Sequence, residues 1–152
     1  MNNMIFGQKS VMNILIKKLH KDSVIPKYAK EGDAGLDLTA TSKWFDADGN
    51  VCYGTGLAFE IPTGYVGLLF PRSSNAKKTL LLSNSVGVLD SGYRGEVTFK
   101  FKNLEDEWSE EYNIGDRIGQ IIILPYPQVN FIEAEELSET ERGDGGYGSS
   151  GV

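Results

Sequence analysis

The side chains best suited to chemistry on a phosphate ester begin at Pro71-Arg72-Ser73-Ser74, directly after an apolar run at residues 65–70. Arg72 offers fork-shaped donors, and hydroxyls at the start of a short helix add further donors beside its free N–H groups. This combination predicts a phosphate site at a strand-to-helix corner. Taken alone, an ordinary helix cap with a surface arginine explains the same residues.

A second segment, residues 84–96, reads Asn-Ser-Val-Gly-Val-Leu-Asp-Ser-Gly-Tyr-Arg-Gly-Glu. Gly92 and Gly95 bracket a turn, so a hairpin between two strands is expected. Its backbone N–H and C=O groups can read the edge of a pyrimidine. Asp90 can deprotonate a water, and Tyr93 can form a wall against a sugar ring. The alternative is a surface hairpin whose tyrosine packs only for stability.

Two polar residues occupy predicted strand ends. Asp37 comes two residues after the glycine turn in Asp-Ala-Gly-Leu-Asp-Leu, where a carboxylate can orient the waters of a hard cation. Gln120 follows the Gly-Asp turn at residues 115–116 and stands beside three isoleucines, so its amide must be exposed or hydrogen-bonded. Plain turn chemistry is the alternative for both.

The last eleven residues, 142–152, contain five glycines and almost nothing apolar to bury. Such a segment is expected to be mobile by itself, because ordering glycine costs the most backbone entropy. Its N–H groups can wrap phosphates, Arg142 can reach a transferring phosphoryl group, and Tyr147 can stack on a base. Ten extended residues reach about 33 Å, far enough to cross to a neighbouring subunit. A disordered terminus is the alternative.

Composition excludes several classes of mechanism. The chain has one cysteine, Cys52, and one histidine, His20, so an internal disulfide, a four-ligand zinc site and Ser-His-Asp or Cys-His catalysis are not expected. Hydrolysis must then use carboxylates, hydroxyls, arginines and an oxygen-held cation. The net charge of −6 argues against binding duplex nucleic acid. No apolar run approaches the length of a membrane span, no secretion signal opens the chain, and the single cysteine suits a cytoplasmic or other reducing compartment.

Short apolar segments separated by turns predict an all-β sandwich or barrel in one domain. Strands are expected at residues 13–19, 36–40, 57–61, 65–70, 96–102, 118–124 and 129–132. The pattern at 96–102 places Val97, Phe99 and Phe101 on one buried face, and the apolar run at 118–124 predicts burial on both faces. One short helix is expected at residues 74–78 with Ser74 as its N-cap. Residues 133–142 permit a helix but lack an apolar stripe.

Five segments have now been singled out, at residues 33–38, 71–74, 84–96, 115–120 and 142–152. Their order and spacing along the chain resemble those of the trimeric dUTPase family from about residue 14 to residue 151. The resemblance implies a jelly-roll-like β-barrel or sandwich (β-clip) with a flexible glycine-rich arm, assembled as a homotrimer whose three active sites each use all three chains. Residues 12–141 would form the β-domain and 142–152 the arm that closes a neighbour's site. Residues 1–11 are a natural extension or a remnant of expression.

The implied reaction is hydrolysis of dUTP to dUMP and pyrophosphate, which supplies dUMP and keeps uracil out of DNA. Asp90 resembles the general base that activates water for attack on the α-phosphorus, and Arg142 and Ser73 would assist at the phosphates. Asp37 would hold the Mg²⁺ cofactor through water, with the ion bound mainly by substrate phosphates. The resemblance assigns substrate contacts to these residues: Arg72, Ser73, Ser74, Asn84, Val86, Gly87, Val88, Asp90, Tyr93, Gln120, Arg142, Tyr147, Gly148, Ser149 and Ser150.

Departures from the family pattern are small. Tyr147 stands where the family more often has phenylalanine, and Ser150 stands where threonine is common. Gly119 takes a place usually held by alanine, and this glycine is expected to loosen the strand at residues 118–124. The loop at residues 44–53 has no assigned role. Two rivals are a dCTP deaminase and a catalytically silent trimer that binds or regulates a partner. The deaminase family carries a catalytic glutamate near the place of Lys100 and a tryptophan at that of Tyr93.

Overall fold

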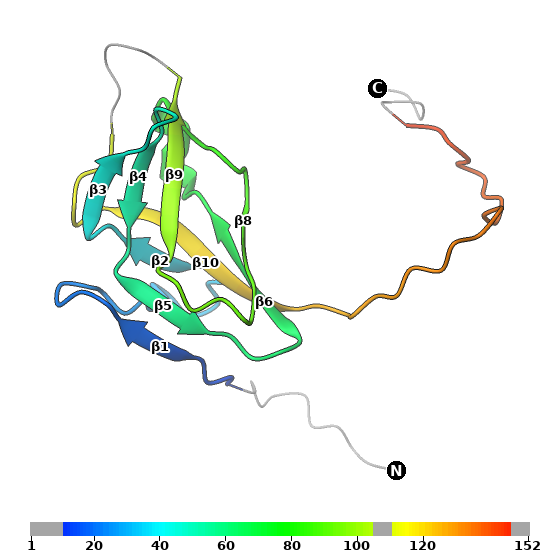
Figure 1. The fold of residues 1–152 in the computed structure, drawn as a ribbon, viewed down its shortest axis with the longest axis horizontal. Helices are drawn as coiled ribbons and strands as arrows, with labels where there is room; N and C mark the ends of the chain where they lie inside the picture. Colours follow the sequence, from blue (N-terminus) through cyan, green and yellow to red (C-terminus); the bar gives the residue numbers. More distant parts are fainter. Residues whose placement is uncertain (1–10, 105–110, 147–152) are drawn as a thin grey trace.

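The computed structural model describes residues 11–104 and 111–146, which form ten strands and one 3₁₀ helix (Figure 1). These elements are β1 (Leu15–Lys18), β2 (Leu36–Thr39), β3 (Ser42–Phe45), β4 (Val51–Gly54), β5 (Leu57–Glu60), β6 (Tyr65–Phe70), η1 (Ser73–Lys77), β7 (Leu80–Leu82), β8 (Gly87–Leu89), β9 (Thr98–Asn103) and β10 (Arg117–Pro125). The predicted all-β class is confirmed, and no described helix is long and apolar enough to cross a membrane.

Every strand pair is antiparallel, and the strands form two four-stranded sheets and one two-stranded sheet. One sheet has the order β2-β10-β6-β8, the second β3-β4-β9-β7, and β1 pairs with β5. The two larger sheets lie in different layers (Figure 1). Consecutive strands therefore cross repeatedly between sheets, as in a jelly-roll-like fold.

The core is built from large side chains of both four-stranded sheets. Tyr53, Phe99 and Phe101 are at most 1% exposed, and the Tyr53 and Phe101 rings meet edge to face at 6.0 Å. The predicted alternation along β9 is confirmed, since Val97, Phe99 and Phe101 are all buried. Such burial supplies the main free energy of folding.

The expectation that residues 118–124 are buried on both faces is correct only for the first half of the run. Ile118 and Ile121 are buried, whereas Leu124 is 43% exposed in the single chain. The pairing of β10 with β2 shifts its register between Arg117 and Gly119, so the ladder is irregular next to the glycine. Gly119 makes room for the Phe99 ring, because a Cβ at this position would overlap the ring carbons.

The predicted strand at residues 129–132 is wrong. These residues pair with no other strand among the described residues, and Val129, Phe131 and Ile132 are 68–92% exposed. Residues 126–146, the extended arm, run away from the body of the molecule (Figure 1), and no helix forms at 133–142. The apolar pattern at residues 129–132 predicts which side chains would be buried in a strand, but it does not predict whether a second strand lies beside it.

Candidate active site

Three of the predicted segments meet at one end of the β2-β10-β6-β8 sheet. Gln120 on β10 lies opposite Asp37 on β2 and Phe70 on β6, so the three residues share one row across the sheet. Phe70 ends β6, and Pro71 then leads the chain into Arg72. The amide Nε2 of Gln120 donates to the carbonyl of Pro71 at 3.1 Å, which satisfies this polar side chain. The sheet register thus brings Asp37, Arg72 and Gln120 together.

Asp37 lies between two arginines. Its Oδ1 accepts from Nε of Arg72 at 2.9 Å, and its Oδ2 accepts from Nη1 of Arg117 at 3.0 Å. The Asp37 and Arg72 side chains are about one quarter exposed, whereas Arg117 is more than half exposed. Two guanidinium groups around one carboxylate leave a net positive charge, which suits binding of an anion. Sequence reasoning missed Arg117, although it directly follows the Gly-Asp turn at 115–116.

Gly35 is required by the Gln120 side chain. A Cβ at Gly35 would overlap Oε1 of Gln120, so the backbone of the 33–35 turn packs directly on this amide. Two segments 85 residues apart in the sequence are therefore fitted to one another. The glycine is needed for close approach rather than for an unusual φ.

The helical corner after Arg72 differs from its prediction. Residues Ser73–Lys77 form a 3₁₀ helix, and Arg72, not Ser74, is the N-cap residue, without a side-chain cap bond. The Ser74 hydroxyl instead lies 3.4 Å from Nη1 of Arg72. This contact orients the hydroxyl toward the arginine.

Two buried tyrosines, Tyr53 and Tyr112, hold the 3₁₀ helix η1 in place through hydrogen bonds. The Tyr112 hydroxyl donates to Oδ1 of Asn75 at 3.0 Å, and the Asn75 amide donates to the carbonyl of Leu80 at 2.7 Å. The Tyr53 hydroxyl donates to the carbonyl of Tyr112 and accepts from its N–H, both at 3.0 Å. Burial raises the pKa of Tyr53 to about 12 and also raises the pKa of Tyr112, so both remain neutral donors.

The predicted pyrimidine-reading segment follows a tight turn. Ser85 has φ 61°, in the left-handed region, and the Val86 N–H donates to the carbonyl of Asn84 at 2.6 Å. Gly87 then pairs with Leu69 of β6, and a Cβ there would lie 2.9 Å from Cβ of Leu69. Gly87 is therefore needed for packing, while Val88 is 64% exposed.

The expected hairpin at residues 84–96 is wrong in its pairing. Strand β8 pairs with β6 and strand β9 pairs with β4 and β7, so the turn joins two different sheets. Within the turn, the Tyr93 N–H donates to the carbonyl of Asp90 at 3.1 Å, and its hydroxyl donates to the carbonyl of Glu96 at 3.1 Å. The Asp90 side chain is at the surface, and Tyr93 is 46% exposed, which leaves the ring available to a ligand.

Asp90 and Arg72 lie at opposite ends of β6. Leu89 pairs with Gly67 near the start of β6, whereas Arg72 follows its last residue, Phe70. At about 3.3 Å per residue, the Cα atoms of Asp90 and Arg72 are roughly 15–20 Å apart. One chain alone therefore does not bring the predicted base to the predicted phosphate contacts.

Arg142 lies on the extended arm, and its Nε donates to the carbonyl of Gly145 at 3.0 Å. The structure does not bring Arg142 to Asp37 or Asp90 of the same chain, since the arm leads away from the body (Figure 1). The predicted contacts Tyr147, Gly148, Ser149 and Ser150 lie outside the described residues. Within the described ranges, no group of three or more His, Cys, Asp or Glu side chains could hold a metal ion.

Comparisons with known proteins agree on one family. The dUTPase family model matches residues 21–151. The deoxyuridine 5′-triphosphate nucleotidohydrolase of Corynebacterium glutamicum is 44% identical over 140 residues, covering 91% of this chain and 94% of the relative. The enzyme of the same name from a Hydrogenobaculum species is 41% identical over 147 residues, covering 93% and 99%.

Solved structures give the same result for the fold. The dUTPase of Staphylococcus bacteriophage 80alpha, a G164S mutant solved with dUpNHpp, superposes with a TM-score of 0.81 at 27% identity, covering 93% of this chain and all of that one. The jelly-roll-like fold is thereby confirmed.

Proposed function

This chain belongs to the dUTPase family and is a dUTP diphosphatase, and from that premise we propose how its residues bind and cleave dUTP. Two halves of the site are involved, which we call the phosphate end and the base end. The phosphate end consists of Asp37, Arg72, Ser73, Ser74, Arg117 and Gln120. The base end consists of Asn84, Val86, Gly87, Val88, Asp90 and Tyr93.

The phosphate end binds the triphosphate. Arg72 and Arg117 both contact Asp37, so their guanidinium groups are held in place before the substrate arrives. Preorganised cations lower the barrier because they need no rearrangement as charge develops on the phosphates. The hydroxyls of Ser73 and Ser74 add neutral donors, and Gln120 fixes the Pro71 carbonyl that precedes Arg72. Positive charge at the end of a rigid sheet is the single observation that supports this assignment best.

The base end reads the nucleoside and activates water. Strand β8 is an edge strand of its sheet, so backbone groups around Val86–Val88 on its unpaired side can pair with the uracil edge. Tyr93 packs against deoxyribose and leaves no room for a 2′-hydroxyl. Asp90 accepts a proton from water as the water oxygen bonds to the α-phosphorus. The bond from that phosphorus to the bridging oxygen breaks, and the products are dUMP and pyrophosphate.

Magnesium is proposed as the cofactor, held mainly by the substrate phosphates. Each oxygen of Asp37 already accepts from one arginine, so this carboxylate suits contact with a metal-bound water better than direct ligation. When bound, Mg²⁺ would neutralise charge on the triphosphate. Asp37 would orient its water shell while keeping Arg72 in place.

We propose further that the protein is a homotrimer with shared sites. The separation of Asp90 from Arg72 within one chain supports a site that combines the base end of one copy with the phosphate end of another. The extended arm exposes Phe131, Ile132 and Leu137 by 84–92% in the single chain, a cost that a neighbouring copy would remove. A groove of about 890 Å³, lined in part by Ile14, Ile16, Leu36, Phe59, Ile121 and Ile123, offers a matching apolar surface. Arg142 and residues 147–150 would then close a neighbour's site.

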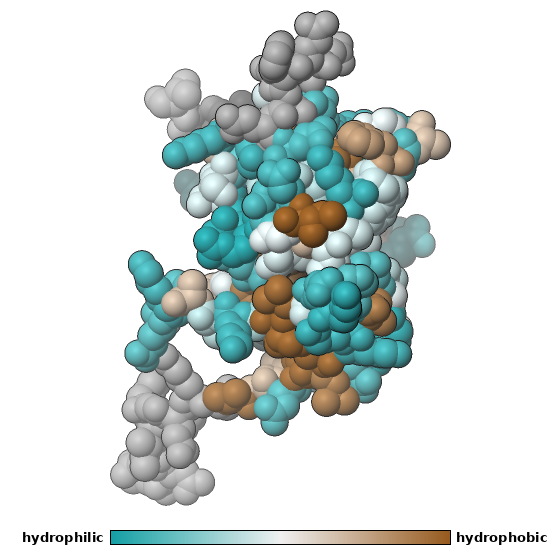
Figure 2. All heavy atoms as spheres, turned by 90° about the vertical axis from the view of Figure 1, so that its left-hand side faces the viewer, coloured by the Kyte–Doolittle hydropathy of each residue, from teal (hydrophilic) through white to brown (hydrophobic). Residues whose placement is uncertain are grey.

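Figure 2 shows apolar side chains from the middle of one face of the molecule to its lower edge, beside a large polar group, with smaller apolar patches in the upper half. Uneven polarity of this kind favours burial of one region in an assembly and exposure of the other.

The test is pyrophosphate release from dUTP, dCTP, dTTP and UTP, each with Mg²⁺ and with excess chelator. Release from dUTP alone, lost on chelation, is expected. Ammonia from dCTP would instead support the deaminase alternative, and no turnover of any nucleotide would support a silent binding protein. Activity on dUTP that persists in chelator would reject magnesium.

A further inference from the structure

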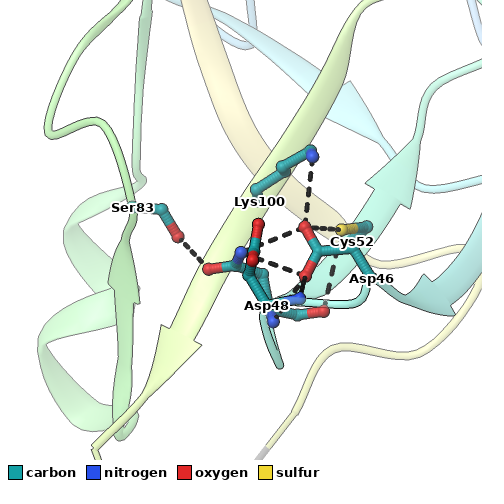
Figure 3. Close-up of polar contacts among 6 residues, drawn as sticks. Asp46, Asp48, Cys52, Ser83 and Lys100 are labelled. Atoms are coloured by element: carbon teal, nitrogen blue, oxygen red, sulfur yellow. Dashed lines mark hydrogen bonds and ion pairs between the residues drawn. The ribbon is translucent and has the colours of Figure 1, made fainter.

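The turn between β3 and β4 is held by an extensive polar network centred on Asp46 (Figure 3). Oδ1 of Asp46 accepts from the N–H groups of Asp48 at 3.1 Å and Asn50 at 2.9 Å, and the Asn50 amide donates to both carboxylate oxygens at 3.0–3.1 Å. Nζ of Lys100, on β9, lies 3.1 Å from Oδ2. The Asp46 side chain is only 16% exposed.

The network continues to the segment that precedes β8. Oδ1 of Asn50 accepts from the Ser83 hydroxyl at 2.7 Å, and the Ser83 N–H donates to the carbonyl of Lys100 at 2.9 Å. Asp46, Asn50, Ser83 and Lys100 therefore form a closed ring of contacts between three segments. Asn50 is 7% exposed, and its side chain is satisfied by the contacts to Asp46 and Ser83.

Ser83 directly precedes the strained turn of the base end, in which the Ser85 N–H donates to the carbonyl of Leu82 at 3.0 Å. Ser85 lies in the left-handed region, which disfavours a residue with a side chain, so neighbouring contacts must hold the turn in place. The next residues, Val86 to Val88, are those proposed to read uracil. A change in the position of Ser83 would therefore move this backbone directly.

We propose that Asp46 and Asn50 are positioning residues, which act through Ser83 to set the backbone of Asn84–Val88 for recognition of the uracil base. This inference rests on the proposed function of the base end. It gives a role to the segment 44–53, which forms the end of β3, the turn at residues 46–50 and the start of β4, and whose contacts reach the site from the opposite sheet.

The sharpest variant is Ser83→Ala, which removes one hydroxyl from an exposed residue and leaves the Asp46 contacts intact. We expect KM for dUTP to rise roughly three- to tenfold, the range that corresponds to loss of one hydrogen bond, with kcat changed less than about twofold. The preference for dUTP over dCTP should fall together with KM. Asn50→Ala should cause the same split with a larger rise in KM.

Two further variants serve as controls. Ser83→Thr keeps the hydroxyl and should restore the wild-type KM. Asp48→Ala removes a charge from the same loop but keeps the backbone N–H that Asp46 accepts, so KM should not change. Thermal unfolding of each variant verifies that the protein is folded at the assay temperature.

The outcomes distinguish a failure of the proposed function from a failure of the positioning role. A wild-type protein without dUTP turnover rejects the proposed function and this inference with it. If the wild type is active, an unchanged KM in both Ser83→Ala and Asn50→Ala rejects only the positioning role. Equal losses of kcat in all variants, with no rescue by Ser83→Thr, would also reject it, because they indicate general damage to the fold.

Discussion

At the scale of single residues, the polar contacts of the site divide between groups that face a ligand and groups that hold them. Asp90, Tyr93 and Ser73 are exposed, whereas Asn75 and Gln120 are partly buried and hydrogen-bonded to backbone carbonyls. Residue types in the sequence identified the first group. They did not identify Arg117, Asn75 or Asp46, because these act through partners 35 or more residues away along the chain or through turns with no evident chemical motif.

Replacing Tyr93 tests the sugar wall. Tyr93→Ala should lower the ratio of kcat/KM for dUTP to that for UTP by roughly ten- to a hundredfold, since removal of the ring opens space for a 2′-hydroxyl. Tyr93→Phe loses only the bond to the Glu96 carbonyl and should keep most of the selectivity. Steady-state kinetics with both nucleotides gives the ratio, and an unchanged ratio in the alanine variant would count against the wall.

Asp46 predicts a specific dependence of stability on pH. Hydrogen bonds from Asn50, and then the contact with Lys100, hold the pKa of the Asp46 carboxyl well below its ordinary value of 3.8. A carboxyl whose pKa is lower in the folded state stabilises the protein above its unfolded pKa, and this contribution is lost as pH falls toward the folded pKa. The difference in free energy of unfolding between wild type and Asp46→Ala should thus be largest near neutral pH and shrink from about pH 4.5 downward.

Urea unfolding at a series of pH values measures that difference. Asp48→Ala is the matched control, because it removes a carboxylate from the same loop without removing a contact of Asp46. A difference between wild type and Asp46→Ala that does not change with pH would contradict the assigned network.

At the scale of elements, local patterns predicted most strands but not all of their partners. Turn residues between Asp90 and Glu96 predicted a reversal of the chain correctly, yet β8 and β9 enter different sheets. Apolar residues at 129–132 predicted a strand, but this segment pairs with no strand among the described residues. The strands β3, β4, β7 and β8 fall outside the predicted strand ranges, although β3 and β4 are as long as the predicted β1, β2 and β5, at four residues each.

Gly119 gives an element-scale prediction. Gly119→Ala should lower the free energy of unfolding by about 1–3 kcal/mol, the usual cost of overpacking a core, because the new methyl group overlaps the Phe99 ring. Gly92→Ala is the control, since a Cβ there meets nothing within 4 Å. The double variant Gly119→Ala with Phe99→Leu should recover part of the loss. Equal stability of Gly119→Ala and wild type in urea unfolding would show that Phe99 moves freely.

At the scale of the whole molecule, strand β6 separates the two ends of the site. Strand β6 carries the phosphate end after its last residue, and β8, paired along it, carries Asp90 at the other end. The family resemblance predicted a shared site. The distance between Asp90 and Arg72 could not be predicted from the sequence, because it depends on the register in which β8 pairs with β6.

The most direct measurement is complementation between two inactive chains. Asp90→Asn removes the proposed base, Arg72→Ala removes a proposed phosphate contact, and each variant alone should lose nearly all dUTP turnover. When the two are co-expressed with different tags and mixed trimers are purified, activity should return to about one third of the wild-type level, because one of the three sites in each mixed trimer combines an intact Asp90 with an intact Arg72 from another chain. Mixed assemblies that stay as inactive as the separate variants would contradict sites built from two chains.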